Sequence, residues 1–243
     1  MAVVVVSGTG TEIGKTVVTA AVAAAAARAE GRSVAVLKPA QTGVGPDERG
    51  DADEVVRLAG PGVTGRELAR FPEPLAPATA ARRARMAPVR ADEVAEAAEK
   101  LATEHDLVLV EGAGGLLVRF DDQGTTLADA ARLLGAPVLV VAPAGLGTLN
   151  MAALTGEALR ARGLEQLGVV VGSWPRDPGL AERCNLADLP DAAGAPLLGA
   201  VPEGAGALSP EAFRAAAPGW LGARLGGTWD AEAFERAVSA GGR

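Results

Sequence analysis

Cysteine, histidine and aromatic residues are scarce in this chain of 243 residues. It has one cysteine, Cys184, and one histidine, His105. A single cysteine cannot close an internal disulfide, and these two residues alone cannot build a zinc cluster. We therefore expect a reducing, cytoplasmic setting. Aromatic residues make up 3% of the chain and there is no tyrosine, so stacking platforms for single-stranded nucleic acid are not expected.

The chain also lacks an excess of positive charge and a long apolar stretch. Its net charge is −7, which argues against a nucleic-acid backbone as the main partner, although backbone amides can still bind a phosphate locally. No run of about eighteen residues is free of charges, polar residues and breakers, so no membrane span is expected. The apolar run from Ala2 to Val6 has no basic segment before it and does not resemble a signal peptide.

Short apolar runs alternate with helical patterns along the chain. Such uninterrupted runs are typical of parallel strands that are covered on both faces. Strands are expected at Val3–Val6, Val34–Leu37, Leu107–Val110, Val138–Val141, Val169–Val171 and Leu197–Val201. Helices are expected at 16–29, 51–59, 91–104, 126–134, 150–162 and 179–188. The alternation predicts a doubly wound α/β fold with a mostly parallel sheet of about six or seven strands and right-handed crossovers.

The length of the chain fits one α/β domain or two small ones. We expect this domain to cover residues 1–225, followed by a tail or surface helix over 226–243. Residues 61–88 and 172–196 are rich in proline, glycine and alanine. They are expected to form loops with short helices.

The segment VVVVSGTGTEIGKTVVT, residues 3–19, carries the strongest functional signal. Four valines lead into a glycine-rich turn that ends in Gly14-Lys15-Thr16 and opens a helix. This order suits a nucleoside triphosphate, because the loop amides and the helix dipole both face the anion. Lys15 can reach the β and γ phosphates, and the Thr16 hydroxyl can ligate Mg²⁺.

The glycine spacing of this loop departs from the common phosphate-binding motif. That motif has four residues between its glycines, whereas five separate Gly8 from Gly14, and Thr9 stands where the first glycine would fall. An ordinary strand–turn–helix, with glycines serving geometry alone, is the alternative. The strand before the loop and the helix after it favour a phosphate site.

Further candidate residues follow the other predicted strands, where ligands of parallel sheets gather. Lys38 could neutralise charge on a transferring phosphoryl group, or it could simply snorkel from a strand end. Glu111 could be a second Mg²⁺ ligand, or a solvated charge. Asp51 or Asp53 could complete the metal shell, or cap a helix.

Two glycine-containing segments also leave two interpretations open. Gly112–Gly115 could let the backbone approach a ligand closely, or only make a turn. Gly147–Asn150 opens a predicted helix, whose free N–H groups suit a carboxylate, and an ordinary N-cap explains the same pattern.

Taken together, these motifs resemble the dethiobiotin synthetase family. The similar segments are GTGTEIGKT at 8–16, KPAQTG at 38–43, VEGAGG at 110–115 and GLGTLN at 145–150. They occur in that family's order and approximate spacing, over about residues 3–202, and the longer glycine spacing is typical of the family. The resemblance implies a P-loop NTPase-like core and a cyclo-ligase of biotin biosynthesis. Such an enzyme closes the ureido ring of dethiobiotin from 7,8-diaminopelargonate, CO₂ and ATP, with Mg²⁺.

The resemblance also implies a role for each matching residue. The catalytic residues would be Lys38, Lys15 and Thr11, and the metal ligands Thr16, Asp51 and Glu111. Asp51 matches better than Asp53, because Gly50-Asp-Ala fits the family's small-Asp-Ala segment. The nucleotide would contact Gly10, Thr11, Glu12, Ile13, Gly14, Lys15, Thr16, Val17, Ser173, Trp174, Pro202, Glu203 and Gly204. The substrate would contact Glu12, Lys38, Thr42, Glu111, Gly112, Gly115, Gly147, Thr148, Leu149 and Asn150.

An obligate homodimer is a further implication of the resemblance. In the family, the segment that corresponds to Gly147–Asn150 of one subunit binds the substrate carboxylate of the other. Many members also carry Asn-Asp after the fifth strand to read adenine. This chain has Gly172-Ser173-Trp174-Pro175 there, so its preferred base stays open.

Three other functions remain as alternatives. A P-loop ATPase of the dimerising switch or positioning class would carry a signature lysine early in the loop, where this chain has Gly10. A larger amidating synthetase would add a glutamine-hydrolysing domain with a nucleophilic cysteine, for which the chain is too short. A nucleotide-binding scaffold without turnover would not need both Lys15 and Lys38.

Overall fold

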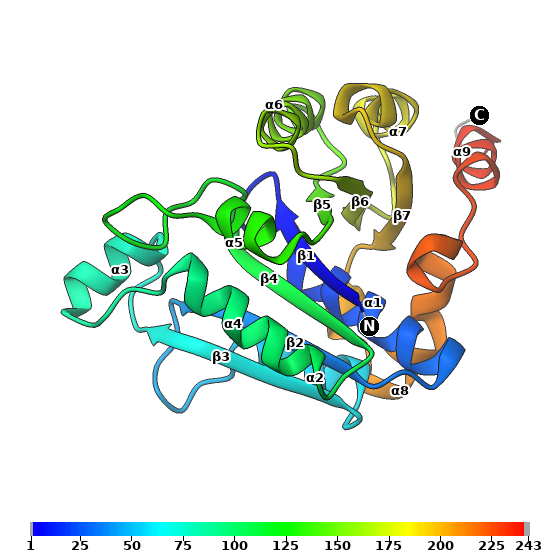
Figure 1. Cartoon of the computed structure of the whole chain (residues 1–243). Coiled ribbons are helices and arrows are strands. Elements are labelled where there is room, and N and C mark those ends of the chain that lie inside the picture. The colour runs from blue at the N-terminus through cyan, green and yellow to red at the C-terminus, as the bar shows by residue number, and fades with distance from the viewer. Residues whose placement is uncertain (1, 241–243) are drawn as a thin grey trace.

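The apolar runs of the sequence form one parallel sheet in the computed structural model, which describes residues 2–240. Its strands are β1 (Ala2–Gly8), β2 (Val34–Thr42), β3 (Val63–Phe71), β4 (Leu107–Gly115), β5 (Val138–Ala142), β6 (Gln166–Trp174) and β7 (Leu197–Pro202). They lie in the order β3-β2-β4-β1-β5-β6-β7, and every neighbouring pair is parallel. The expected doubly wound α/β fold is confirmed (Figure 1).

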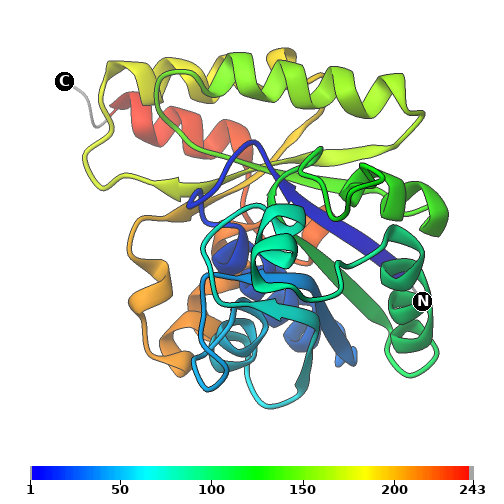
Figure 2. The ribbon, with the colours of Figure 1, turned by 90° about the vertical axis from the view of Figure 1, so that its left-hand side faces the viewer.

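Helices cover both faces of this sheet (Figures 1 and 2). They are α1 (Lys15–Glu30), α2 (Asp51–Ala59), α3 (Pro77–Ala84), α4 (Ala91–Ala102), α5 (Leu127–Leu134), α6 (Thr148–Ala161), α7 (Leu180–Ala193), α8 (Pro210–Ala216) and α9 (Ala231–Ala240). Short 3₁₀ turns at Ala205–Ala207, Ala217–Trp220 and Ala223–Leu225 flank α8. Each expected helix is present, with ends that differ by a few residues.

Alternate residues of each central strand pack into two separate cores. Val5 and Val108 lie on the face covered by α3 to α7 and α9, whereas Val6 and Leu109 face α1, α2 and α8. All four are fully buried. This two-sided burial explains why the strands read as continuous apolar runs instead of alternating ones.

The expectation of loops over 61–88 is wrong for its first part, which forms the edge strand β3. Only Val63 and Phe71, its two end residues, are buried, and Thr64, Gly65 and Arg66 between them are exposed. An edge strand is hydrogen-bonded to one neighbour only, and its other edge faces solvent. It therefore carries charged residues and cannot be recognised as an apolar run. Residues 77–84 form α3.

Residues 172–196 are also more regular than expected. The helix predicted at 179–188 continues through Pro190 to Ala193. Its buried side chains include Leu186, Leu189 and Ala193, which are three and four residues apart. This spacing places them on one face against the sheet, and the surrounding proline and alanine obscure the pattern.

Strands β2 and β4 run several residues beyond their predicted ends. The pairing of β2 with β3 continues through Lys38↔Glu67 and Ala40↔Ala69 to Thr42↔Phe71. Gly115, the last residue of β4, pairs with Gly8 of β1. Lys38 and Glu111 therefore project from paired, rigid strand backbone.

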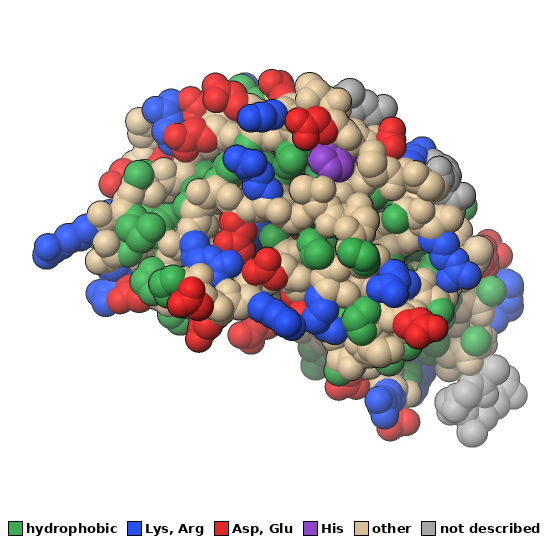
Figure 3. All heavy atoms as spheres, turned by 90° about the horizontal axis from the view of Figure 1, so that it is seen from below, with side chains coloured by type: hydrophobic (Ala, Val, Ile, Leu, Met, Phe, Trp, Pro, Cys, Tyr) green, Lys and Arg blue, Asp and Glu red, His purple; other side chains and the backbone are tan. Residues whose placement is uncertain are grey.

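The C-terminal helix α9 packs against the same face as α7. The Phe234 ring lies edge-on to Trp174 with centroids 5.3 Å apart, and it also contacts Trp229. Residues 241–243 of the expected tail lie outside the described residues, as does residue 1 of the expected domain. No helix within 2–240 is both long and apolar enough to cross a bilayer. Acidic and basic side chains are interspersed on the face in Figure 3.

Candidate active site

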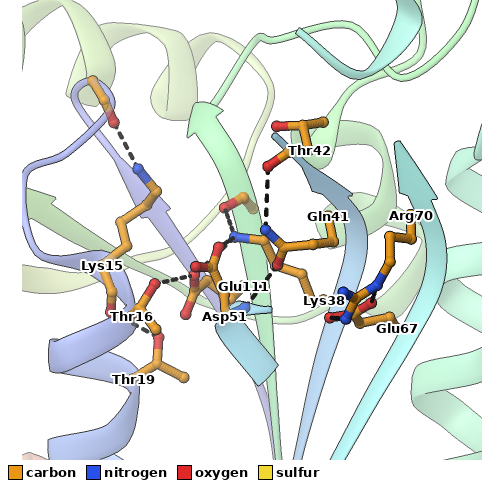
Figure 4. Close-up of polar contacts among 12 residues, drawn as sticks. Lys15, Thr16, Thr19, Lys38, Gln41, Thr42, Asp51, Glu67, Arg70 and Glu111 are labelled. Atoms are coloured by element: carbon orange, nitrogen blue, oxygen red, sulfur yellow. Dashed lines mark hydrogen bonds and ion pairs between the residues drawn. The ribbon is translucent and has the colours of Figure 1, made fainter. Parts of the chain in front are cut away.

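A cavity of about 800 Å³ lies at the carboxyl ends of β1, β2 and β4. The phosphate loop forms one wall, and the start of α2 and the segment before α3 form the others. The lining residues are Thr11, Glu12, Gly14, Lys15, Thr16, Val17, Lys38, Gln41, Thr42, Val44, Asp51, Pro74, Leu75, Ala76, Pro77, Glu111, Ala113, Gly114 and Val118. Figure 4 shows the charged residues at its base.

The phosphate loop is seated against the end of β6 by a contact between two glycines. Gly14 has φ +92°, and a Cβ there would lie 2.4 Å from the Gly172 carbonyl oxygen. A Cβ on Gly172 would lie 2.0 Å from the Ile13 carbonyl oxygen. Neither position has room for a larger residue, so Gly172 contributes the space that the loop needs.

Lys38 is held between two carboxylates at the base of the cavity. Its Nζ lies 2.9 Å from Glu111 Oε1 and 2.5 Å from Asp51 Oδ2, and it donates to the Gly112 carbonyl oxygen at 3.1 Å. The side chain is 3% exposed. Burial opposes the charged form, but the two carboxylates outweigh it and raise the pKa of Lys38 above its ordinary 10.5.

Glu111 also connects this cluster to the phosphate loop. The Thr16 hydroxyl donates to Glu111 Oε1 at 2.9 Å. Glu111 Oε2 is buried and has no hydrogen-bond partner among the described residues. A buried carboxylate oxygen without a donor is costly, and a cation would satisfy it.

The donor set therefore fits Mg²⁺. Thr16, Asp51 and Glu111 would supply a hydroxyl and two carboxylates, which are the hard oxygen ligands that Mg²⁺ prefers alongside water and phosphate. Within residues 2–240 no three His, Cys, Asp or Glu side chains gather as a metal cluster.

Lys15 is the second ammonium group of the site. Its Nζ donates to the Gly10 carbonyl oxygen at 2.7 Å, across the phosphate loop. Burial and the neighbouring charge of Lys38 lower the pKa of Lys15 from its ordinary 10.5. The chain has three lysines, Lys15, Lys38 and Lys100, and two of them meet here. Two ammonium groups beside the loop amides suit the binding of an anion.

Asp51 and Asp53 occupy different positions at the start of α2. Asp53 Oδ2 accepts from the backbone N–H of Gly50 at 3.0 Å and so closes the helix end. Asp51 instead directs its carboxylate at Lys38. The sequence left capping and a place in the polar site open for both residues. In the structure Asp53 caps the helix, and Asp51 lies in the polar site.

Comparison with known proteins agrees with these features. A family model described as an AAA domain matches residues 2–210. The chain is 74% identical to the ATP-dependent dethiobiotin synthetase BioD of Streptomyces avermitilis, over 98% of this chain and 99% of that protein. It is 73% identical to the synthetase of the same name from Streptomyces coelicolor, over 96% and 98%. The chain belongs to the dethiobiotin synthetase family.

Solved structures of other ATPases share the fold of this family member. A ParA family ATPase from Chlorobium tepidum superposes with a TM-score of 0.55 at 14% identity, over 88% of this chain and 90% of that one. MinD, a cell division protein of Aquifex aeolicus, superposes at 0.53 and 16%, over 84% and 82%. At these identities the likeness concerns the fold alone.

Several residues implied by the family resemblance lie outside the lining of the cavity. Ser173, Trp174, Pro202, Glu203 and Gly204 lie at the ends of β6 and β7 or just beyond. The ends of β6 and β7 lie together, since Glu203 N donates to Trp174 O at 2.7 Å. The turn after β7 approaches the first turn of α1, because a Cβ on Gly206 would lie 3.2 Å from a side-chain carbon of Val17. The Trp174 ring packs on Phe234 of α9.

The remaining implied residues divide into two groups. Gly10 and Ile13 belong to the phosphate loop, and Gly112 and Gly115 belong to β4, all beside the cavity but not on its surface. Gly147–Asn150 forms the N-terminus of α6 and does not line the cavity. Thr148 Oγ1 is buried there without a described hydrogen-bond partner, and the neighbouring Leu146 is 89% exposed.

Sequence reasoning missed Gln41 and the apolar wall of the site. Gln41 Oε1 accepts from the backbone N–H of Asp51 at 2.7 Å. The wall consists of Val44, Pro74, Leu75, Ala76, Pro77 and Val118. A polar residue one place before Thr42 was a usable signal for Gln41. The apolar wall had no such signal in the sequence, because its residues come from segments without a recognisable motif.

We expect Lys15 to lose its proton at a lower pH than Lys38. Burial and the charge of Lys38 lower the pKa of Lys15, whereas Glu111 and Asp51 raise that of Lys38. Carbon-13 NMR of the lysine side chains during an alkaline titration measures both. The chain has three lysines and no tyrosine, and Lys100→Arg identifies the third signal.

Lys38→Met provides the internal check of this titration. Removal of the Lys38 charge should move the Lys15 transition to higher pH, because one cause of its lowered pKa is gone. An unchanged Lys15 transition would show that the two ammonium groups do not interact.

Proposed function

We propose that this protein is an ATP-dependent dethiobiotin synthetase, a cyclo-ligase that closes the ureido ring of dethiobiotin from 7,8-diaminopelargonate and CO₂. The family relationship supports the reaction. The observation that carries the proposal is the buried Lys38 between two carboxylates, directly opposite a phosphate loop. Such a group stabilises negative charge that spreads over a phosphoryl group in transfer.

The reaction divides into three balanced steps. One amine of the substrate adds to CO₂, loses a proton and becomes a carbamate. A carbamate oxygen attacks the γ phosphorus of ATP, so that ADP leaves and a carbamic–phosphoric anhydride forms. The second amine then attacks the carbonyl carbon and loses a proton, the C–O bond breaks, inorganic phosphate leaves and the ring closes. Phosphorylation is needed because a carbamate oxygen is otherwise a poor leaving group.

The residues of the cavity divide this work between them. The loop amides and Lys15 bind the β and γ phosphates. Lys38 lies between the phosphate loop and the apolar wall, where it contacts both the carbamate and the γ phosphate. Thr11, Glu12 and Thr42 border the diamine. Thr16, Asp51 and Glu111 would hold Mg²⁺, which would supply positive charge to neutralise the phosphates.

Two subunits form the active site in this proposal. Gly147–Asn150 does not line its own cavity, and the family resemblance implies that it binds the substrate carboxylate at the cavity of a second copy. Leu146, Met151 and Leu154 are exposed around this helix start, at 89%, 42% and 53%. Exposed apolar side chains of this kind are typical of a subunit interface.

The rival reading as a switch or positioning ATPase has less support. Proteins of that class share the fold. Their signature lysine is absent, because Gly10 stands at that position. The Gly10 carbonyl oxygen accepts a hydrogen bond from Lys15, and a lysine side chain would bring a further charge beside it.

Purified protein should release phosphate from ATP only when diaminopelargonate, bicarbonate and Mg²⁺ are all present. Dethiobiotin formation, followed by mass spectrometry, should match phosphate release one to one. CTP and GTP in place of ATP measure the base preference, since Gly172 and Ser173 replace the usual Asn-Asp. Phosphate release that does not depend on the diamine contradicts the proposal.

Lys38→Ala should lower turnover about 100- to 1,000-fold, because one preorganised charge at the transferring phosphoryl group is lost. Nucleotide binding, measured by calorimetry, should persist through Lys15 and the loop amides. Lys100→Ala is the matched control, an exposed lysine on α4. Near-normal turnover in Lys38→Ala would mean that the phosphoryl group is transferred elsewhere.

Subunit mixing tests the shared active site. Lys38→Ala and Asn150→Ala should each be inactive as homodimers. An equal mixture, allowed to exchange subunits, should regain about a quarter of normal activity, since half of the dimers contain one intact site out of two. No recovery under conditions where labelled subunits exchange would argue that each subunit works alone.

A further inference from the structure

The loop between β2 and α2, residues 43–50, is held at its start by Gly43 N, which donates to the Phe71 and Glu73 carbonyl oxygens at 3.0 and 3.1 Å. Further along, the Arg70 guanidinium group of the edge strand bonds it. Arg70 Nε and Nη2 donate to Glu67 Oε2 and Oε1, both at 2.9 Å. Arg70 Nη1 donates to the Gly45 carbonyl oxygen at 3.0 Å and also to the Glu48 carbonyl oxygen. Arg70 thus joins β3 to two points of this loop.

The last residue of the loop lies flush against the same group. A Cβ on Gly50 would lie 2.1 Å from Glu67 Oε1, and 3.0 Å from both Arg70 Nη2 and Gln41 Oε1. The Gly50 backbone therefore packs against side chains that project from two neighbouring strands, β2 and β3. A side chain at this position would displace the ends of the Glu67, Arg70 and Gln41 side chains, so glycine lets the end of the loop pack directly on them.

Asp51 follows directly and inherits this position. Gln41 is 4% exposed, and its Oε1 accepts from Asp51 N at 2.7 Å. Asp53 closes the helix start through Gly50 N and lies 3.6 Å from Arg70 Nη2. The Asp51 side chain is 36% exposed and forms an ion pair with Lys38, beside which it lies in Figure 4. Because so little else contacts this side chain, its position depends on the backbone that carries it.

We propose that Arg70 is a positioning residue, which holds the 43–50 loop through Glu67 so that the Asp51 carboxylate stays beside Lys38 and Glu111. The proposal rests on the proposed function, because it assigns Arg70 to the cation and phosphate end of that site. Partners behind a metal ligand set its orientation, and their loss typically lowers metal affinity 10- to 100-fold. Only a planar fork can bond Glu67 and the loop together, so lysine is not equivalent.

The test compares Arg70→Met with Arg66→Met, which alters an exposed arginine on the same strand. In Arg70→Met, the Mg²⁺ concentration for half-maximal turnover should rise about 10-fold. Turnover at saturating Mg²⁺ should change much less, because Lys15 and Lys38 remain. Arg66→Met should match the unaltered protein in both quantities. A merely structural role would lower turnover without this dependence on Mg²⁺.

A second readout needs no activity. Amide hydrogen exchange of the ligand-free protein should become at least about 10-fold faster in peptides that cover residues 43–53 of Arg70→Met, with the central strands unchanged. If the unaltered protein makes no dethiobiotin, the proposed function fails, and exchange still tests the fastening of the loop. Faster exchange with an unaltered Mg²⁺ requirement overturns the positioning role, and unaltered exchange overturns the whole proposal.

A coupling experiment separates action through Asp51 from a general effect. In an Asp51→Asn background, Arg70→Met should change the Mg²⁺ requirement less than about twofold, since the ligand it positions is already impaired. A full effect in that background overturns the proposal. If Arg70→Met does not fold, Arg70→Lys replaces it, with the same directions expected and the same results counted against it.

Discussion

The ion cluster formed by the buried Lys38 and Glu111 with the partly exposed Asp51 is the constraint on which the active site depends. A lone ammonium group at 3% exposure would be strongly disfavoured, and removal of either charge type would leave the other uncompensated. The two carboxylates hold Lys38 charged, and they are also the residues that a cation would use. The positive charge of Lys38 is therefore compensated by these carboxylates before substrates bind.

The parallel sheet supplies the precision that this cluster needs. Lys38 and Glu111 project from the middle of adjacent strands, and Thr16 lies at the start of α1 behind the phosphate loop. Asp51 is the exception, because a loop delivers it. The edge strand β3 compensates for that weakness, since Glu67 and Arg70 fasten the loop to the sheet. An edge strand that contributes little to the core thus gains a function.

The glycines of the site follow from close backbone contacts. Gly14 and Gly172 let the phosphate loop rest on the end of β6, and Gly50 lets the β2–α2 loop rest on Glu67 and Gln41. The contacts of Gly172 with Gly14 and Ile13 supply a steric reason for a small residue at this position. Beyond Gly172, Trp174 is buried and Glu203 is exposed at the ends of β6 and β7.

Local sequence determined the central strands, the phosphate loop and the identity of the charged residues, because buried parallel strands and a glycine-rich turn have strong short-range patterns. It did not reveal β3, whose exposed side chains resemble those of a loop, or the separate positions of Asp51 and Asp53, which two equivalent carboxylates leave undetermined. Tertiary structure decided those points. Pairing with β2 defines an edge strand, and only the packing of Gly50 against Glu67, Arg70 and Gln41 directs one aspartate inward and leaves the other as a cap.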